Sequence, residues 1–190
     1  MSSGVLKARY LAVNTPESTG QIEEWGKKAS NYTREKLSGA ESIIVESNDT
    51  QWHMDSSGGR FMGWVWYKPQ GESEYRNLNL ELVQNGLSLA SGATTDLYGN
   101  TTAQAYTQAK AYKLNIFSGE KDPDFYYGGA IPVDLKTLRL NTELYANKTV
   151  AFTGIIARNS NNTVYVEAYD EETDLYYGMN VYCGYTSGEI

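Results

Sequence analysis

The sequence predicts an α+β fold that is mainly β and has two parts joined by a linker. Sixteen tyrosines and four tryptophans among 190 residues are typical of a protein rich in aromatic β-strands. Strand-like runs and three helical segments alternate up to residue 117, and three more strand-like runs follow residue 148. Glycine, proline and charged residues are frequent over 118–138, which indicates the linker. We therefore expect domains over 1–117 and 139–190.

The first part begins with a strand over 5–13, which ends in the turn Thr15-Pro16-Glu17-Ser18. Apolar residues then recur at helical spacing from Ile22 to Tyr32, and they predict a helix over 21–37 that Gly39 ends. Further along the chain, we expect strands over 42–47 and 60–67, and helices over 78–85 and 101–113.

The second part has the pattern of a meander of three strands, over 149–157, 164–169 and 175–183. A meander with Gly154 inside its first strand is similar to the opening of an OB-type barrel, so we expect a partial OB-like β unit over 139–190. Three strands leave unpaired edges. Incomplete barrels of this kind suggest completion within the chain or in a homo-oligomer.

Composition restricts the function classes. Net charge is −7, and residues 1–117 carry 11 Lys and Arg against 12 Asp and Glu, a balance that is unfavourable for holding a polyanion. A single cysteine, Cys183, excludes a disulfide within the chain, and with a single histidine, His53, it argues against a zinc site or a Cys/His nucleophile.

The sequence also bears on location. No apolar run approaches the length of a membrane span, and the first four residues have no features of a signal peptide. Those residues could replace a longer native N-terminus. We expect a secreted or cell-surface bacterial protein, with a cytoplasmic location as the alternative.

Three charged residues carry the candidate chemistry. Arg9 and Glu17 lie at the two ends of a strand-to-turn junction, and Arg60 follows Gly59 directly before the apolar run Phe61 to Tyr67. Arginine can neutralise a phosphate, and glutamate can activate a water molecule. A charged residue beside a turn is more often a solvated surface group, so the combination matters more than any one member. Asp55, in the loop before Arg60, could help to hold a cation, although a loop aspartate is usually solvated.

These motifs, in this order, resemble the thermonuclease (staphylococcal nuclease) family. The resemblance covers about residues 4–117 and is carried by the run Arg9-Tyr10-Leu11-Ala12-Val13-Asn14-Thr15-Pro16-Glu17, by Gly59-Arg60 and by the helical run from Ala103 to Phe117. It implies an OB-type five-stranded barrel with three helices that cleaves DNA or RNA with calcium. Arg9 and Arg60 would clamp the phosphate, and Glu17 would be the general base.

The resemblance also implies where calcium would bind. In the family, two aspartates and a threonine carbonyl bind the ion; Asn14 replaces one of these aspartates, and Thr15 supplies the carbonyl. The other aspartate belongs to an N-terminal hairpin, which the residues before Arg9 are too few to form. A neutral amide at residue 14 would weaken calcium binding, because affinity falls with the ligand charge count.

Two functions therefore stay open. The first is a calcium-dependent phosphodiesterase acting on DNA or RNA, favoured by Arg9, Glu17 and Arg60. The second is a non-catalytic module that kept the scaffold and binds nucleic acid, protein or glycan. Asn14 and the low positive charge favour the second, as does the stretch Ser56-Ser57-Gly58, where the family has a lysine-tyrosine pair.

Overall fold

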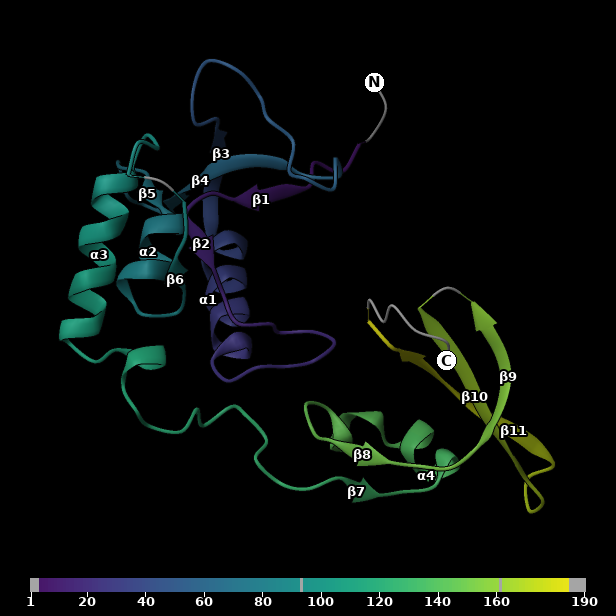
Figure 1. Ribbon diagram of the computed structural model, residues 1–190. Coiled ribbons are helices and arrows are strands. Elements are labelled where there is room, and N and C mark those ends of the chain that lie inside the picture. The colour runs from purple at the N-terminus through teal and green to yellow at the C-terminus, as the bar shows by residue number, and fades with distance from the viewer. Residues whose placement is uncertain (1–3, 93, 161, 185–190) are drawn as a thin grey trace. The chain divides into compact units, whose positions relative to one another are not determined.

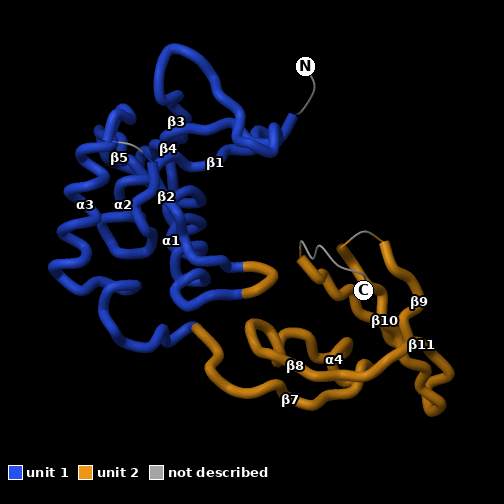
Figure 2. Tube along the Cα trace, viewed as in Figure 1, with its two compact units in different colours: residues 1–18, 22–124 blue, residues 19–21, 125–190 orange. Residues whose placement is uncertain are grey.

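A computed structural model describes residues 4–92, 94–160 and 162–184 (Figure 1). The chain divides into two compact units (Figure 2). Unit 1 comprises residues 1–18 and 22–124, and unit 2 comprises residues 19–21 and 125–190. In the described parts of both units, no helix is long and apolar enough to cross a bilayer.

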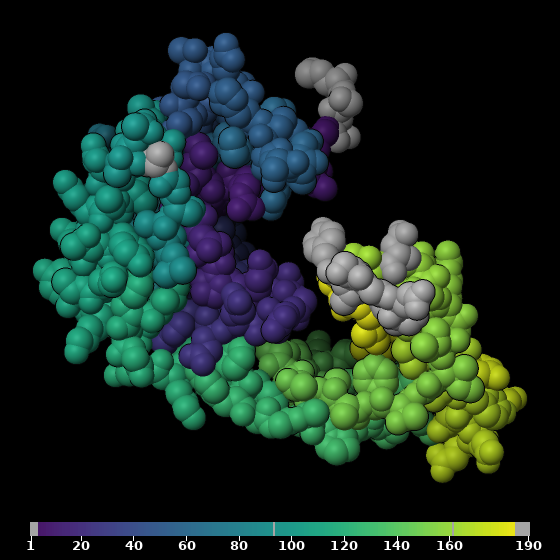
Figure 3. All heavy atoms as spheres, in the orientation of Figure 1, coloured from purple at the N-terminus to yellow at the C-terminus, as the bar shows by residue number. Residues whose placement is uncertain are grey.

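Unit 1 is organised around β4 (Phe61–Pro69), the central strand of its larger sheet. This strand pairs in parallel with β1 (Ala8–Tyr10), and antiparallel with β3 (Ala40–Glu46) and β5 (Arg76–Asn77). A separate two-stranded ladder joins β2 (Val13–Asn14) to β6 (Leu89–Ala90). The space-filling view shows the N-terminal segment, in purple, at the surface beside the blue residues that lead into β4 (Figure 3).

The expected strand over 5–13 is divided into β1 and β2. The chain bends between them because Ala12 adopts a left-handed conformation, with φ 59°. Its side chain is buried, and Asn79 fixes the bend by donating from Nδ2 to the Leu11 carbonyl, at 2.8 Å. The bend turns β2 away from the larger sheet and toward β6.

Three α-helices complete unit 1, as predicted: α1 (Gly26–Ser38), α2 (Leu78–Gln84) and α3 (Gly99–Ala111), followed by the 3₁₀ turn η1 (Asn115–Phe117). Helix α1 begins five residues later than the apolar spacing indicated, because Trp25 is left-handed, with φ 68°. Helix α2 is capped by the Asn77 side chain, which accepts from the Leu80 amide at 3.1 Å. The core contains Ala29 of α1, Val65 and Tyr67 of β4, and Leu78 and Leu82 of α2.

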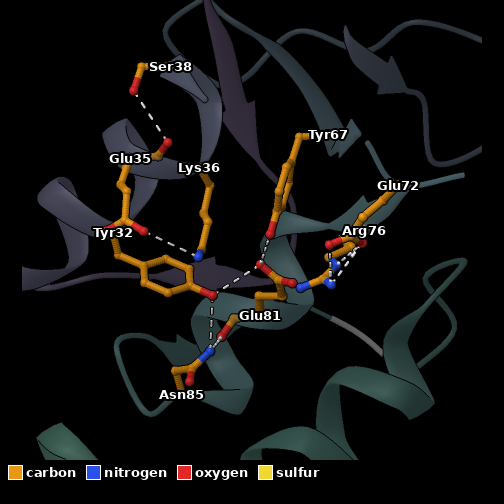
Figure 4. Close-up of polar contacts among 9 residues, drawn as sticks. All are labelled: Tyr32, Glu35, Lys36, Ser38, Tyr67, Glu72, Arg76, Glu81 and Asn85. Atoms are coloured by element: carbon orange, nitrogen blue, oxygen red, sulfur yellow. Dashed lines mark hydrogen bonds and ion pairs between the residues drawn. The ribbon is translucent and has the colours of Figure 1, made fainter. Parts of the chain in front are cut away.

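A polar cluster ties α1, β4 and α2 together (Figure 4). Tyr32 and Tyr67 both donate to Oε2 of Glu81, at 3.1 Å and 2.8 Å. Burial, with the carboxylate of Glu81 as a second cause, raises the pKa of Tyr67 to about 12 and also raises the pKa of Tyr32. Asn85 extends the cluster by donating to the hydroxyl of Tyr32. These bonds hold the two helices against the strand.

Unit 2 contains an antiparallel meander, as predicted, in the order β11-β10-β9. Its strands are β9 (Ile155–Ser160), β10 (Thr163–Asp170) and β11 (Leu175–Tyr182). The unit also has the parallel pair β7 (Ile131–Pro132) and β8 (Val150–Ala151), the helix α4 (Leu135–Leu140) and the 3₁₀ turn η2 (Thr142–Tyr145). Its first predicted strand is divided at Gly154, where a β-carbon would lie 2.8 Å from Leu135 Cδ1.

Two expectations need correction or revision. Within residues 4–92, 94–160 and 162–184, no five strands close into a barrel, because the bend at Ala12 leaves β2 and β6 as a ladder of their own. The segment 118–138, expected as a linker, contains β7 and the first part of α4. An OB-type relationship for 139–190 stays a prediction.

Candidate functional site

A pocket of about 420 Å³ in unit 1 brings together all five residues that the sequence singled out. Arg9, Asn14, Thr15, Glu17 and Arg60 line it, together with Ala8, Tyr10, Val13, Thr33 and Leu82. Unit 2 has a pocket of about 380 Å³, but no residue that lines it carries a charge. Concave sites with a few convergent polar groups are the usual places for binding and catalysis.

The parallel pairing of β1 with β4 brings the two arginines together. The amide of Phe61 donates to the Lys7 carbonyl at 2.8 Å, and Arg9 is the register partner of Met62. Arg60 therefore enters the sheet beside the start of β1.

The buried side chain of Asn79 stabilises the place where β1 pairs with β4. It donates to the carbonyls of Leu11 and Gly63, at 2.8 and 3.1 Å, and accepts from the Val65 amide at 2.9 Å. Both polar ends of this side chain are thus satisfied by backbone groups of β4 and of the bend after β1.

Asp55 orients Arg60, contrary to the expectation of a solvated loop aspartate. Its side chain is 4% exposed, and its Oδ2 accepts from Nε of Arg60 at 2.6 Å. A bond from the Ser57 hydroxyl, followed by the guanidinium of Arg60, lowers the pKa of Asp55 to about 2. The side chain of Arg60 stays 43% exposed, so it is held in direction but accessible from solvent.

Asn14 and Glu17 reach the pocket from β2 and from the turn that follows. The amide of Asn14 donates to Oγ of Ser88, a side chain with no exposed surface. The amide of Glu17 donates to Oε2 of Glu23 at 2.9 Å, which fixes the backbone of the turn while the Glu17 side chain stays exposed.

The described residues at the pocket supply only some of the oxygen donors that a calcium ion takes. Asn14 offers an amide oxygen, Thr15 a carbonyl and Glu17 one carboxylate, whereas Ca²⁺ takes six to eight oxygens and binds more tightly as carboxylates are added. Among the described residues there is no group of three or more acidic, histidine or cysteine side chains that could hold a metal ion. Calcium thus stays a prediction from the family.

Sequence reasoning found five of the lining residues, gave Asp55 a different role, and missed Asn79 and Ser88. Asp55, Asn79 and Ser88 are all buried and polar, and all bond to the strands or turns that carry the pocket. A polar residue inside an apolar helical pattern, such as Asn79 between Leu78 and Leu82, was the one available signal.

Comparison with known proteins agrees with the geometry. The family model described as "Staphylococcal nuclease homologue" matches residues 7–119, a range that includes every residue lining the pocket. A search of curated proteins found no match. Since the family model covers more than half of the 190 residues, the chain belongs to the staphylococcal nuclease homologue family.

Proposed function

We propose that unit 1 binds phosphodiester groups of DNA or RNA in the pocket of Arg9 and Arg60 and hydrolyses them with Glu17 as general base. One observation carries the proposal: two arginines and one glutamate line the same pocket, with Arg60 coming from a segment distant in sequence from Arg9 and Glu17. The family binds nucleic acids and is generally calcium-dependent, which agrees with this substrate class.

The chemistry follows from the charges. Arg9 and Arg60 neutralise the phosphate and stabilise the additional negative charge that develops as water attacks phosphorus. Glu17 takes the proton from that water, so a hydroxide oxygen bonds to phosphorus while the bond to the leaving sugar oxygen breaks. The leaving oxygen takes a proton from solvent.

A second candidate is a non-catalytic module that binds nucleic acid on the same scaffold. Two observations favour it: the pocket supplies one carboxylate for a metal, and residues 1–117 have a net charge of −1. Such a module would use Arg9 and Arg60 for phosphate binding and would not need Glu17.

One set of variants separates the two candidates. We would measure cleavage of a fluorescent single-stranded oligonucleotide, with calcium or chelator, and binding by fluorescence anisotropy. Arg9→Ala and Arg60→Ala should each lower kcat/KM by about 100-fold. Arg34→Ala, at an exposed position of α1, is the matched control and should change neither quantity.

Glu17→Gln then decides between hydrolysis and binding alone. It should abolish cleavage and leave binding within about twofold, because the amide keeps the shape but not the base. Binding without cleavage by the unaltered protein at every calcium concentration would establish the second candidate. If the unaltered protein showed no binding and no cleavage, both candidates would be refuted.

Asn14→Asp tests how the pocket relates to calcium. It adds a second carboxylate at the pocket and should lower the calcium concentration needed for half-maximal cleavage. An unchanged or higher calcium requirement would mean that residue 14 does not contact the ion.

A further inference from the structure

The backbone of Glu17 is held at both of its polar groups by one residue, Glu23. The Glu17 amide donates to Oε2 of Glu23, and the Glu23 amide donates to the Glu17 carbonyl, each at 2.9 Å. The two bonds close a short loop and use only the backbone of Glu17, a residue that lines the pocket. The direction of the candidate base is thus set by its backbone, and Glu23 fixes that backbone.

The start of α1 packs directly on the same peptide. A β-carbon at Gly26, the first residue of the helix, would overlap the carbonyl oxygen of Glu17 and lie 2.7 Å from its carbonyl carbon. It would also lie 3.0 Å from the Pro16 carbonyl oxygen. The glycine permits this close approach, so any shift of the helix start moves Glu17 with it.

The helix start is in turn fixed by Asp122. The backbone amide of Trp25 donates to Oδ2 of Asp122 at 2.6 Å, and Oδ1 of Asp122 accepts from the Asp124 amide at 2.9 Å. The side chain of Asp122 is buried, at 1% exposure, and Trp25 is 7% exposed. Trp25 is left-handed, a conformation that bulky residues rarely adopt, and the charge-assisted bond to Asp122 stabilises it.

We propose that Asp122 and Glu23 are positioning residues for Glu17. Together they form what we call the anchor of the Glu17 peptide. Asp122 locks the left-handed turn at Trp25, that turn sets the place of Gly26, and Gly26 and Glu23 together hold the peptide of Glu17. Asp122 lies outside the range matched by the family model, which ends at residue 119. The catalytic part of this inference rests on the proposed function; the structural part does not.

The test combines a kinetic and a structural readout in the full chain. Asp122→Ala should lower kcat by about 10- to 100-fold with KM within about twofold, since a misplaced base slows chemistry without weakening phosphate binding. In hydrogen exchange, the Glu17 amide should exchange at least about tenfold faster. Asp122→Asn keeps an oxygen acceptor, so its kcat and its exchange rate at the Glu17 amide should stay close to those of the unaltered protein. Asp124→Ala, two residues away and exposed, is the matched control.

Other variants keep the proposal testable if Asp122→Ala does not fold. Glu23→Ala should release the Glu17 amide while Trp25 stays buried, and Gly26→Ala should displace the same peptide from the other side. Unchanged exchange at Glu17 in these folded variants would overturn the anchor. A rise in KM at constant kcat would overturn the positioning role. If the unaltered protein does not cleave, the proposed function fails, and exchange alone decides whether the anchor exists.

Discussion

Among the described residues, unit 1 buries polar as well as apolar side chains, whereas unit 2 buries only apolar ones. Unit 1 contains all six of the buried polar side chains among the described residues: Asp55, Asn77, Asn79, Ser88, Thr102 and Asp122. In the described part of unit 2, the buried apolar side chains are Leu135, Leu138 and Val164, while large apolar residues such as Ile155 and Tyr176 are 70% and 64% exposed. All six side chains of unit 1 make hydrogen bonds, although Nδ2 of Asn77 has no partner, and such bonds define geometry as well as stability. Buried polar side chains therefore fix the backbone geometry of unit 1, whereas unit 2 depends on a small apolar core.

The four tryptophans allow the two units to be followed separately. Trp25, Trp52, Trp64 and Trp66 all belong to unit 1. Tryptophan fluorescence therefore reports the unfolding of unit 1, and exchange of the β10 amides reports unit 2.

The largest effect is expected when unit 1 loses a satisfied buried amide. Asn79→Ala leaves the Val65 amide and the Leu11 carbonyl without their partner, which should lower the free energy of unfolding of unit 1 by about 3–4 kcal/mol. Urea unfolding followed by tryptophan fluorescence measures this. Asn100→Ala, at an exposed position of α3, should change it by less than about 0.5 kcal/mol. A loss below about 1 kcal/mol for Asn79→Ala would contradict the conclusion that unit 1 depends on its buried polar side chains.

Unit 2 should respond most to a cavity in its small core. Leu138 of α4 is 3% exposed, and Leu138→Ala should cost unit 2 about 2–3 kcal/mol. Faster exchange of the β10 amides would report this loss, with tryptophan fluorescence unchanged. Leu140→Ala, at a side chain 64% exposed, is the control. A parallel shift in the fluorescence transition would show that the two units unfold as one.

Alkaline pH should affect unit 1 through its tyrosine cluster. The pKa of Tyr67 is raised from 10 to about 12 in the folded state, so its stabilisation is complete below pH 10 and is lost as pH rises toward 12. Urea midpoints at pH 9, 10 and 11 should fall more steeply for the unaltered protein than for Tyr67→Phe. Tyr112→Phe, at a ring 74% exposed, should keep the original slope. Equal slopes for all three proteins would contradict a buried hydroxyl bonded to Glu81.

The smallest effect concerns an ion pair of unit 2. Lys136 contacts Asp170 at 2.9 Å and Glu172 at 3.1 Å, near the surface. Lys136→Gln should destabilise unit 2 by less than about 1 kcal/mol, and the difference should shrink in 1 M salt. Exchange of β10 amides at two salt concentrations would measure it. A salt-independent loss of several kcal/mol would mean that unit 2 also depends on polar geometry.

Sequence reasoning succeeded where the information is local. The run from Arg9 to Glu17 includes four of the five candidate residues, and together with Gly59-Arg60 it carries the family resemblance that implied their roles. Helix α1 followed from apolar spacing and a glycine stop, and α2 and α3 lie within or near the ranges 78–85 and 101–113 that the sequence predicted. The meander of unit 2 followed from alternation and turn residues.

It failed where a residue depends on a distant partner or on an uncommon backbone conformation. Asn79 bonds to a carbonyl 68 residues away, and Asp122 bonds to an amide 97 residues away. Left-handed Ala12 and Trp25 contradict the steric preference of their types, so the break of the first strand and the late start of α1 had no sequence signal. Both misses lie next to the candidate site, where tertiary contacts override local preference.

The location of Asp122 has a consequence for modularity. Similarity to the family ends at residue 119, which invites the view that a complete nuclease-like module ends there. The side chain that fixes the start of α1 comes three residues later, and its second oxygen holds the amide of residue 124. A fusion or a domain exchange that joins new sequence at residue 119 would keep every residue of the pocket and lose the support of its turn. The transferable piece of this protein therefore extends to residue 124.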